Sequence, residues 1–228
     1  NNYTLTVNTD GHGTAGTSGS YAYGTAITLT ATPATGYQFK AWTGDYTTAT
    51  FTMPAKDVTV TATFQPKTYT LSFNNGGHGT TPDSKSVTYD AVYGTLAVLT
   101  ADGYTFVGWF TEATGGTEVT ATTIYQVDDD STLYAHWTVV TYTLTLNADN
   151  GSANTTKDYN IEQSITLPTP TKTGYTFKGW SPAVPTTMPA EDMTITAQWQ
   201  INQYTITFNT DGGNEIEPIT QNYNTAIS

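Results

Sequence analysis

The clearest candidate for ion chemistry in this 228-residue chain is the acidic run Asp128 to Asp130. Carboxylate oxygens are the hard ligands that Ca²⁺ prefers. The run does not show the D-x-[DN]-x-[DN]-G spacing of an EF-hand loop, and short charge runs usually lie in solvated turns. We therefore predict a solvated turn here and no metal site.

Three histidines and one pair of glutamates are the other candidates for metal binding or catalysis. His12 and His78 lie in matching Gly-His-Gly turns and His136 in a predicted strand, so the sequence shows no cluster of ligands. Glu112 and Glu118 could form an acid–base pair, but they lie in a segment that the rest of the chain does not repeat. The sequence contains no G-x-S-x-G, HExxH or P-loop motif. We predict no catalytic residues, no cofactor and no enzymatic activity.

Lys40 and Lys178 could form isopeptide cross-links to asparagine if they were buried beside a carboxylate. Each is the polar member of an alternating strand pattern, which places it on the solvent face. We therefore expect no such cross-link.

The composition narrows the class of partner. The formal net charge is −12, and the seven basic residues are all lysines, whereas nucleic-acid binding needs clustered positive charge. The same charge opposes docking to an anionic membrane surface. The chain has no cysteine and no apolar run long enough to cross a bilayer, so we expect an extracellular bacterial segment without membrane insertion.

A seven-residue phrase, Gly-Tyr-x-Phe-x-x-Trp, organises the chain. It occurs three times, at Gly36–Trp42, Gly103–Trp109 and Gly174–Trp180, which predicts a tandem array of small modules. The aromatics of the phrase could form a sugar-stacking platform, but we predict that Tyr37, Phe39, Trp42 and their equivalents build the core, since modules this small need large aromatics there. Three tyrosines lie outside the repeated pattern and are the better surface candidates: Tyr46, Tyr93 and Tyr125.

Alternating apolar and polar residues predict a mainly β array of small sheet modules with little or no helix. The opening strand recurs four times, at Tyr3–Val7, Tyr69–Phe73, Tyr142–Leu146 and Tyr204–Phe208. A second strand is expected in two pieces in each module: Tyr21–Tyr23 with Ala26–Ala31, Val87–Tyr89 with Leu96–Leu99, and Asp158–Tyr159 with Ile165–Leu167. A closing strand follows each phrase and ends on a large aromatic: Phe64, Trp137 or Trp199.

These strands divide the chain into modules at residues 1–66, 67–139 and 140–201, with residues 202–228 as an incomplete fourth. The predicted linkers, Gln65–Thr68, Thr138–Thr141 and Gln200–Gln203, are too short for free rotation, so we expect a semi-rigid string. The fourth module either continues beyond this segment or is completed by another chain.

The second module resembles a Listeria–Bacteroides repeat, also called the internalin B B-repeat. The resemblance rests on the YTLSF strand, the NNGGHG turn, the GYTFVGWF phrase, the ATGGTEV insert and the LYAHW close. The first and third modules carry a Met-Pro-Ala segment and resemble the divergent form of the repeat. The family implies extracellular bacterial modules with a β-grasp-like fold, found in adhesins and invasion proteins, and no known catalytic residues.

We expect a structural stalk of a bacterial surface or secreted protein, in which neighbouring modules contact one another. One alternative is an adhesin that binds a host or matrix glycan or protein, with specificity in the loops, above all Phe110–Asp130. Another alternative is a filament in which copies of the chain complete one another by strand addition.

Overall fold

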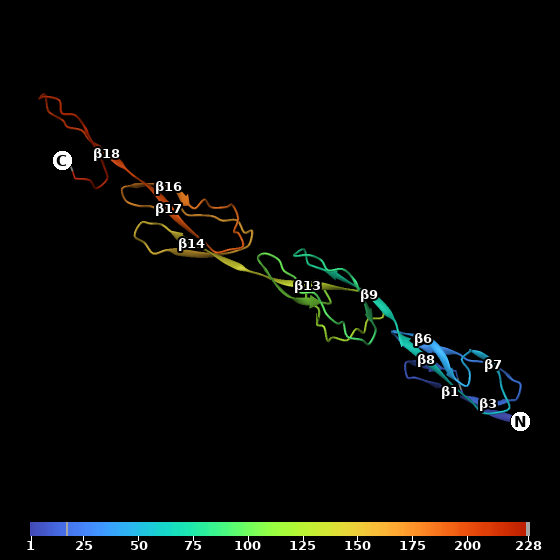
Figure 1. The fold of residues 1–228 in the computed structure, drawn as a ribbon. Helices are drawn as coiled ribbons and strands as arrows, with labels where there is room; N and C mark the ends of the chain where they lie inside the picture. The colour runs from blue at the N-terminus through green and yellow to red at the C-terminus, as the bar shows by residue number, and fades with distance from the viewer. Residues whose placement is uncertain (17, 227–228) are drawn as a thin grey trace. The chain divides into compact units, whose positions relative to one another are not determined.

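The computed structural model describes residues 1–16 and 18–226, and over these residues it consists of strands, turns and loops without a helix (Figure 1). The predicted mainly β fold is confirmed. The chain divides into two compact units. One contains residues 1–100 and 106–137, and the other contains residues 101–105 and the described residues from 138 onward.

The first module forms a four-stranded sheet and two small ribbons. The sheet has the order β3-β1-β8-β6, with β1 (Asn2–Thr9), β3 (Gly19–Ala22), β6 (Tyr37–Gly44) and β8 (Val58–Pro66). One ribbon pairs β2 (Gly13–Ala15) with β5 (Ala31–Pro33), and the other pairs β4 (Ala26–Thr28) with β7 (Thr50–Thr52). The opening and closing strands, β1 and β8, run parallel, and the other two strands flank them in antiparallel pairing.

The second and third modules follow the same plan. The second sheet has the order β10-β9-β13-β11-β12, with β9 (Thr68–Asn74), β10 (Lys85–Thr88), β11 (Tyr104–Phe110), β12 (Glu118–Val119) and β13 (Ser131–Val139). The third has the order β15-β14-β17-β16, with β14 (Thr141–Asn147), β15 (Thr155–Asn160), β16 (Tyr175–Ser181) and β17 (Met193–Ile201). In each, the opening and closing strands are again parallel neighbours. The last segment forms one ribbon, β18 (Gln203–Ile206) with β19 (Ile219–Asn222).

The predicted second strands are confirmed in their first pieces. Tyr21–Tyr23 overlaps β3, Val87–Tyr89 overlaps β10, and Asp158–Tyr159 lies within β15. The second pieces in the last two modules, Leu96–Leu99 and Ile165–Leu167, are loops and not strands. In these two loops the apolar side chains of Leu96, Leu99, Ile165 and Leu167 still pack into the core of their modules. In the first module, the predicted strand Ala26–Ala31 is divided into β4 and β5. Side-chain alternation therefore marks which residues face the core and does not by itself give ladder pairing.

The central strands supply the middle of each core. The leucine at the third position of the opening pattern is fully buried in all three complete modules: Leu5, Leu71 and Leu144. The tryptophan of the phrase is also buried in the first two, as predicted for Trp42 and its equivalent Trp109. Tyr37 is buried too.

Phe39 was predicted in the core, yet 39% of it is exposed. It lies on the outer strand β6 opposite Phe64, and a β-bulge follows it before Ala41. The bulge adds one residue, which returns Trp42 to the core face three positions later, opposite Ala62. Trp42 is the buried residue, while Phe39 packs at a tilt against Trp42 and edge-on against Phe64.

The three tyrosines predicted at the surface are packed inward. Tyr93 and Tyr125 are 7% and 0% exposed, and Tyr46 stacks on Phe51 with ring centroids 4.0 Å apart. Tyr125 occupies the place that methionines hold in the other modules. Its amide donates to Ala91 O at 2.8 Å, just as the amide of Met53 donates to Thr25 O and that of Met188 to Gln163 O.

Candidate functional site

The acidic run Asp128 to Asp130 is exposed, as predicted, but it is bound to the opening strand of its own module. Asp128 accepts hydrogen bonds from Tyr69 Oη and, at 3.0 Å, from Lys67 Nζ. These two donors lower the pKa of Asp128. The carboxylates therefore have protein partners, and their arrangement is that of a solvated turn that fastens one strand.

Asp130 shows the common role of the aspartate that precedes each closing strand. Its Oδ1 accepts from the amide of Thr70 at 2.7 Å, at the point where β9 extends beyond the start of β13. The equivalent pairs are Asp57 with the Thr4 amide at 2.7 Å and Asp192 with the Thr143 amide at 2.8 Å. The carboxylate supplies the acceptor that the parallel ladder lacks there. The recurring order Asp, then an alternating strand, was the signal in the sequence.

The histidines lie in three separate aromatic contacts. His12 stacks on Tyr37 with centroids 4.3 Å apart, and His136 stacks on Phe110 at 3.9 Å. His78 meets the edge of Trp137 at 5.8 Å. Across residues 1–16 and 18–226, no three potential metal ligands come together.

The lysines at the repeated position, Lys40 and Lys178, are both exposed, as predicted. Solvent exposure removes the buried setting that an isopeptide bond would need. The two glutamates lie on a hairpin in the second module: Glu118 starts β12, and Glu112 follows β11. Their hairpin is not shared by the other modules.

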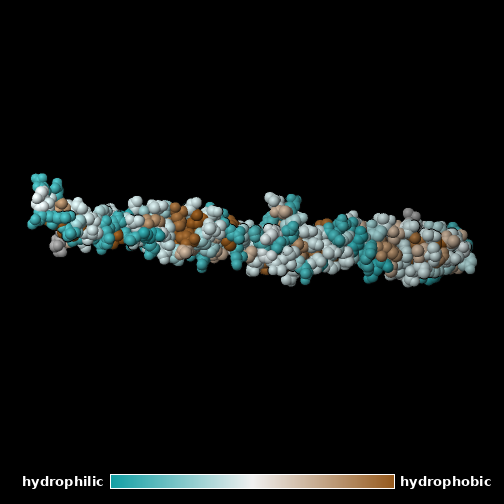
Figure 2. Space-filling model, turned by 90° about the horizontal axis from the view of Figure 1, so that it is seen from above, coloured by the Kyte–Doolittle hydropathy of each residue, from teal (hydrophilic) through white to brown (hydrophobic). Residues whose placement is uncertain are grey.

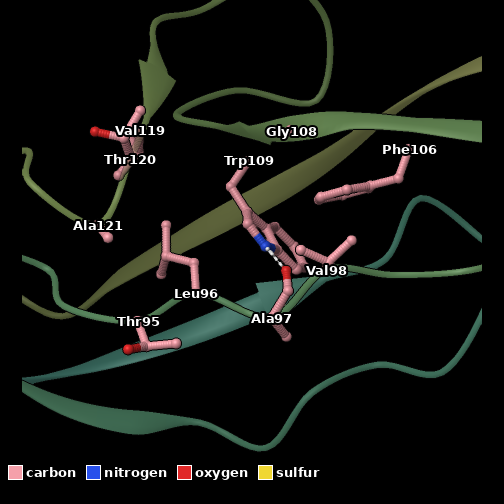
Figure 3. Close-up of a pocket in the computed structure, with 10 residues that line it drawn as sticks. All are labelled: Thr95, Leu96, Ala97, Val98, Phe106, Gly108, Trp109, Val119, Thr120 and Ala121. Atoms are coloured by element: carbon pink, nitrogen blue, oxygen red, sulfur yellow. Dashed lines mark hydrogen bonds between the residues drawn. The ribbon is translucent and has the colours of Figure 1, made fainter.

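A hollow of about 260 Å³ lies in the second module, between the loop that carries Ala97, strand β11 and the insert (Figure 3). Its walls are mainly apolar and include Phe106, Trp109 and Val119. Trp109 Nε1 donates to Ala97 O at 2.7 Å, which fixes the indole on its floor. Val98 stands at the rim and is 81% exposed. Residues 119–121 belong to the segment predicted to carry specificity.

The second feature of interest is a joint where one module meets the next within the first unit. The predicted four-residue linker is wrong, because β8 continues to Pro66 and β9 begins at Thr68, leaving only Lys67 between them. The amide of Lys67 donates to Gly36 O at 2.8 Å, and the carbonyl of Lys67 accepts from the amide of Tyr89 at 3.0 Å. The linker is thus bonded on both sides.

Gly36, the first residue of the phrase, is required by this joint. Its φ is +78°, a conformation that costs any other residue energy. A Cβ at Gly36 would also overlap the ring of Tyr89, which packs directly on it. The phrase glycine therefore serves contact between modules, not only entry into a strand.

The second unit repeats these contacts. The amide of Val140 donates to Gly103 O at 2.8 Å, and Ile161 packs on Gly103. The amide of Asn202 donates to Gly174 O at 2.9 Å, and Tyr223 packs on Gly174. Both glycines have nearly the same φ as Gly36, +74° and +78°. We define the joint as this set: phrase glycine, single linker residue, and the large apolar residue of the following turn.

The fold and these joints define a class of protein: a tandem array of small β modules that contact one another through a repeated backbone joint. The chain belongs to the Listeria-Bacteroides repeat family, whose model matches residues 69–136 and 142–198. The model of the divergent InlB B-repeat domain matches residues 3–68. The third module, likened above to the divergent form, is thus matched by the regular one. The matching families are repeat domains and not enzyme families.

Three curated relatives share parts of this chain. A protein described as a Gly-rich membrane protein of Evansella cellulosilytica is 28% identical over 85% of this chain and 26% of its own length. A second membrane protein of that organism is 29% identical over 75% of this chain and 27% of its own length. Internalin H of Listeria monocytogenes is 37% identical over 45% of this chain and 20% of its own length. The chain thus spans about a quarter of these relatives, which point to a surface-associated protein.

Among the residues that the structure describes, we find no helix with the length and apolar character needed to cross a membrane.

Proposed function

We propose that this segment is a non-enzymatic structural spacer of an extracellular bacterial surface protein, which supports or projects a functional domain. The observation that carries the proposal is the joint. A single residue connects consecutive modules, and its amide donates to a phrase glycine at every joint. At Lys67 and Asn202 the carbonyl also accepts from the amide of the following turn. A linker held in this way has little of the freedom of a flexible tether.

The composition of the surface supports the same role. The face seen in Figure 2 is mostly hydrophilic or neutral, with apolar residues in separate patches. Net charge of −12 keeps copies of the chain apart.

The spacing between the first two modules tests the proposal. The chain has no cysteine, so spin labels can be attached at T47C and S84C, two exposed positions in these modules. Electron spin resonance should give one narrow distance distribution. Insertion of Gly-Gly-Ser after Lys67 should broaden it, and this variant is the control. A broad distribution in the chain without the insertion would overturn the spacer role.

A second candidate function rests on the apolar hollow of the second module. An adhesin could use it to hold an apolar group or the face of a sugar, with Phe106 and Trp109 as walls. Glycan arrays and pull-downs with host matrix proteins would use the full chain, the rim variant V98K, and the control V107K. Val107 is 48% exposed and lies outside the hollow. Binding that V98K abolishes and V107K retains would favour the adhesin.

A further inference from the structure

The turn that enters each joint has a fixed local structure. In the second module it is Tyr89–Asp90, where Asp90 has φ +60° and the Ala91 amide donates to Thr88 O at 3.1 Å. Glu162 and Asn224, which follow Ile161 and Tyr223, have φ +60° and +61°. We call this two-residue element the docking turn: a large apolar residue followed by a residue with positive φ.

The first module carries the same docking turn, Tyr23–Gly24, with Gly24 at φ +83°. The amide of Tyr23 donates to Asn1 O at 3.1 Å, which matches the bond from Tyr89 to Lys67 O. Gly24 donates to Met53 O at 2.9 Å, which matches the bond from Asp90 to Tyr125 O at 2.8 Å. The element is therefore formed before anything docks on it, and Asn1 holds the position of a linker residue.

Tyr23 nevertheless differs from its equivalents in exposure. It is 67% exposed, whereas Tyr89, seated on Gly36, is half-buried. An exposed aromatic ring offers a large apolar area that a partner can bury. Because the turn already holds this ring in place, binding would cost little further conformational freedom.

We propose that Asn1, Tyr23 and Gly24 form a docking surface for the Gly-Tyr-x-Phe-x-x-Trp phrase of another repeat module. This inference rests on the proposed spacer function and names its partner. At each joint described above, the docking turn meets a phrase glycine with φ between +74° and +78°. The incoming glycine would place its carbonyl against the main-chain nitrogen of Asn1, as Gly36 does with that of Lys67.

A second copy of this chain does not fit as the occupant. Its three phrase glycines, Gly36, Gly103 and Gly174, are already covered by Tyr89, Ile161 and Tyr223. The occupant must therefore be a repeat module whose own phrase glycine is uncovered. Gly24 has no carboxylate to accept from the incoming tyrosine, as Asp90 does from Tyr37, so this joint depends more on the Tyr23 ring and the linker amide.

The test adds a copy of residues 140–201 directly ahead of Asn1 of the full chain. The new boundary, Ile-Asn-Asn-Tyr-Thr, closely matches the natural one, Ile-Asn-Gln-Tyr-Thr at Ile201–Thr205. Nitration of Tyr23 by tetranitromethane, followed by mass spectrometry, compares the original and extended chains. We expect at least a fivefold slower modification of Tyr23 in the extended chain. Equal rates in the two chains would overturn the inference.

Two variants of the extended chain separate docking from general protection. Alanine in place of the added copy's phrase glycine should restore the reactivity of Tyr23, whereas alanine at the added copy's exposed equivalent of Thr186 should not. Should the glycine variant fail to fold, Y23S supplies the second readout, since it should broaden the label distance between the added and first modules. An unchanged distance distribution in Y23S would contradict the docking role.

The two proposals fail in different ways. A broad distance distribution between T47C and S84C would remove the spacer function itself. A narrow distribution there, together with full reactivity of Tyr23 in the extended chain, would remove only the docking surface at Tyr23.

Discussion

Tyr37 donates its hydroxyl hydrogen to Asp90 Oδ2 at 2.8 Å, a bond that joins the phrase of the first module to the docking turn of the second, 53 residues further along. The ring of Tyr37 also meets the edge of Tyr89, with centroids 5.8 Å apart. Hydrogen bonding to Asp90 is the main cause that raises the pKa of Tyr37 above 10.0. The joint is therefore sensitive to one ionisable hydroxyl.

This relationship predicts an alkaline loss of the joint. Because the folded-state pKa of Tyr37 lies above its unfolded value of 10.0, its contribution is complete below pH 10 and is lost as pH rises through the folded-state pKa. The distribution of distances between labels at T47C and S84C should broaden above pH 10. Y37F should already give a broader label-distance distribution at pH 7, and this distribution should not broaden further as the pH rises above 10. A pH dependence in Y37F equal to that of the original chain would contradict the assignment.

The phrase glycine predicts a stability difference between two glycine variants. Gly36 and Gly11 both have positive φ, but a Cβ at Gly11 meets nothing within 4 Å, whereas one at Gly36 overlaps Tyr89. G11A should lower the free energy of unfolding by about 1 kcal/mol, the backbone cost alone. G36A should cost about 1–3 kcal/mol more, because Tyr89 must also leave its place. Urea unfolding measures both, and equal losses would show that Tyr89 adds no constraint.

Tyr125, Met53 and Met188 occupy the same core position in their modules. We therefore expect the second module to tolerate methionine at position 125 better than alanine. Y125A should lower the free energy of unfolding of the second module by about 3–5 kcal/mol, since a fully buried aromatic leaves a cavity. Y125M should cost only about 1–2 kcal/mol, because methionine already fills this place in the other modules and adapts its shape. Thermal unfolding followed by tyrosine fluorescence would check the order. A Y125M loss as large as that of Y125A would show that the sites are not equivalent.

Acid should destabilise the first module through Asp10. Asp10 Oδ2 accepts from the amide of Phe64 at 2.8 Å, and this bond is the largest cause that lowers the pKa of Asp10 below 3.8. Since the folded-state pKa is depressed, the stabilisation is complete above about pH 4 and is lost as pH falls through the folded-state value. D10N should show a shallower loss of stability between about pH 4 and pH 2 than the original chain in urea titrations. Identical slopes would remove Asp10 from the acid response.

The sequence by itself predicted the array of modules and contained none of the catalytic or metal-binding motifs considered. Period-2 alternation placed the opening and closing strands because the side chains of a strand with one buried face must alternate. Recurrence of the phrase counted the modules, because each copy must supply its own core. The burial of Leu5 and Tyr37 follows from this alternation. The burial of Trp42 does not, because it depends on the one-residue bulge between Phe39 and Ala41, which the alternation does not predict.

Only the tertiary structure decided which residues meet across the chain. Tyr125 occupies in the second module the core position that Met53 occupies in the first, although the two side chains differ in size. The turn beside this position bonds to the main chain of either residue, so the side chain itself is not specified. The joint pairs Gly36 with Tyr89 and Tyr37 with Asp90, residues brought together by the continuation of strands through a single linker residue. Local pattern records the face that each residue presents. Contacts between modules depend on how complete sheets are placed, and no local period in the sequence encodes that.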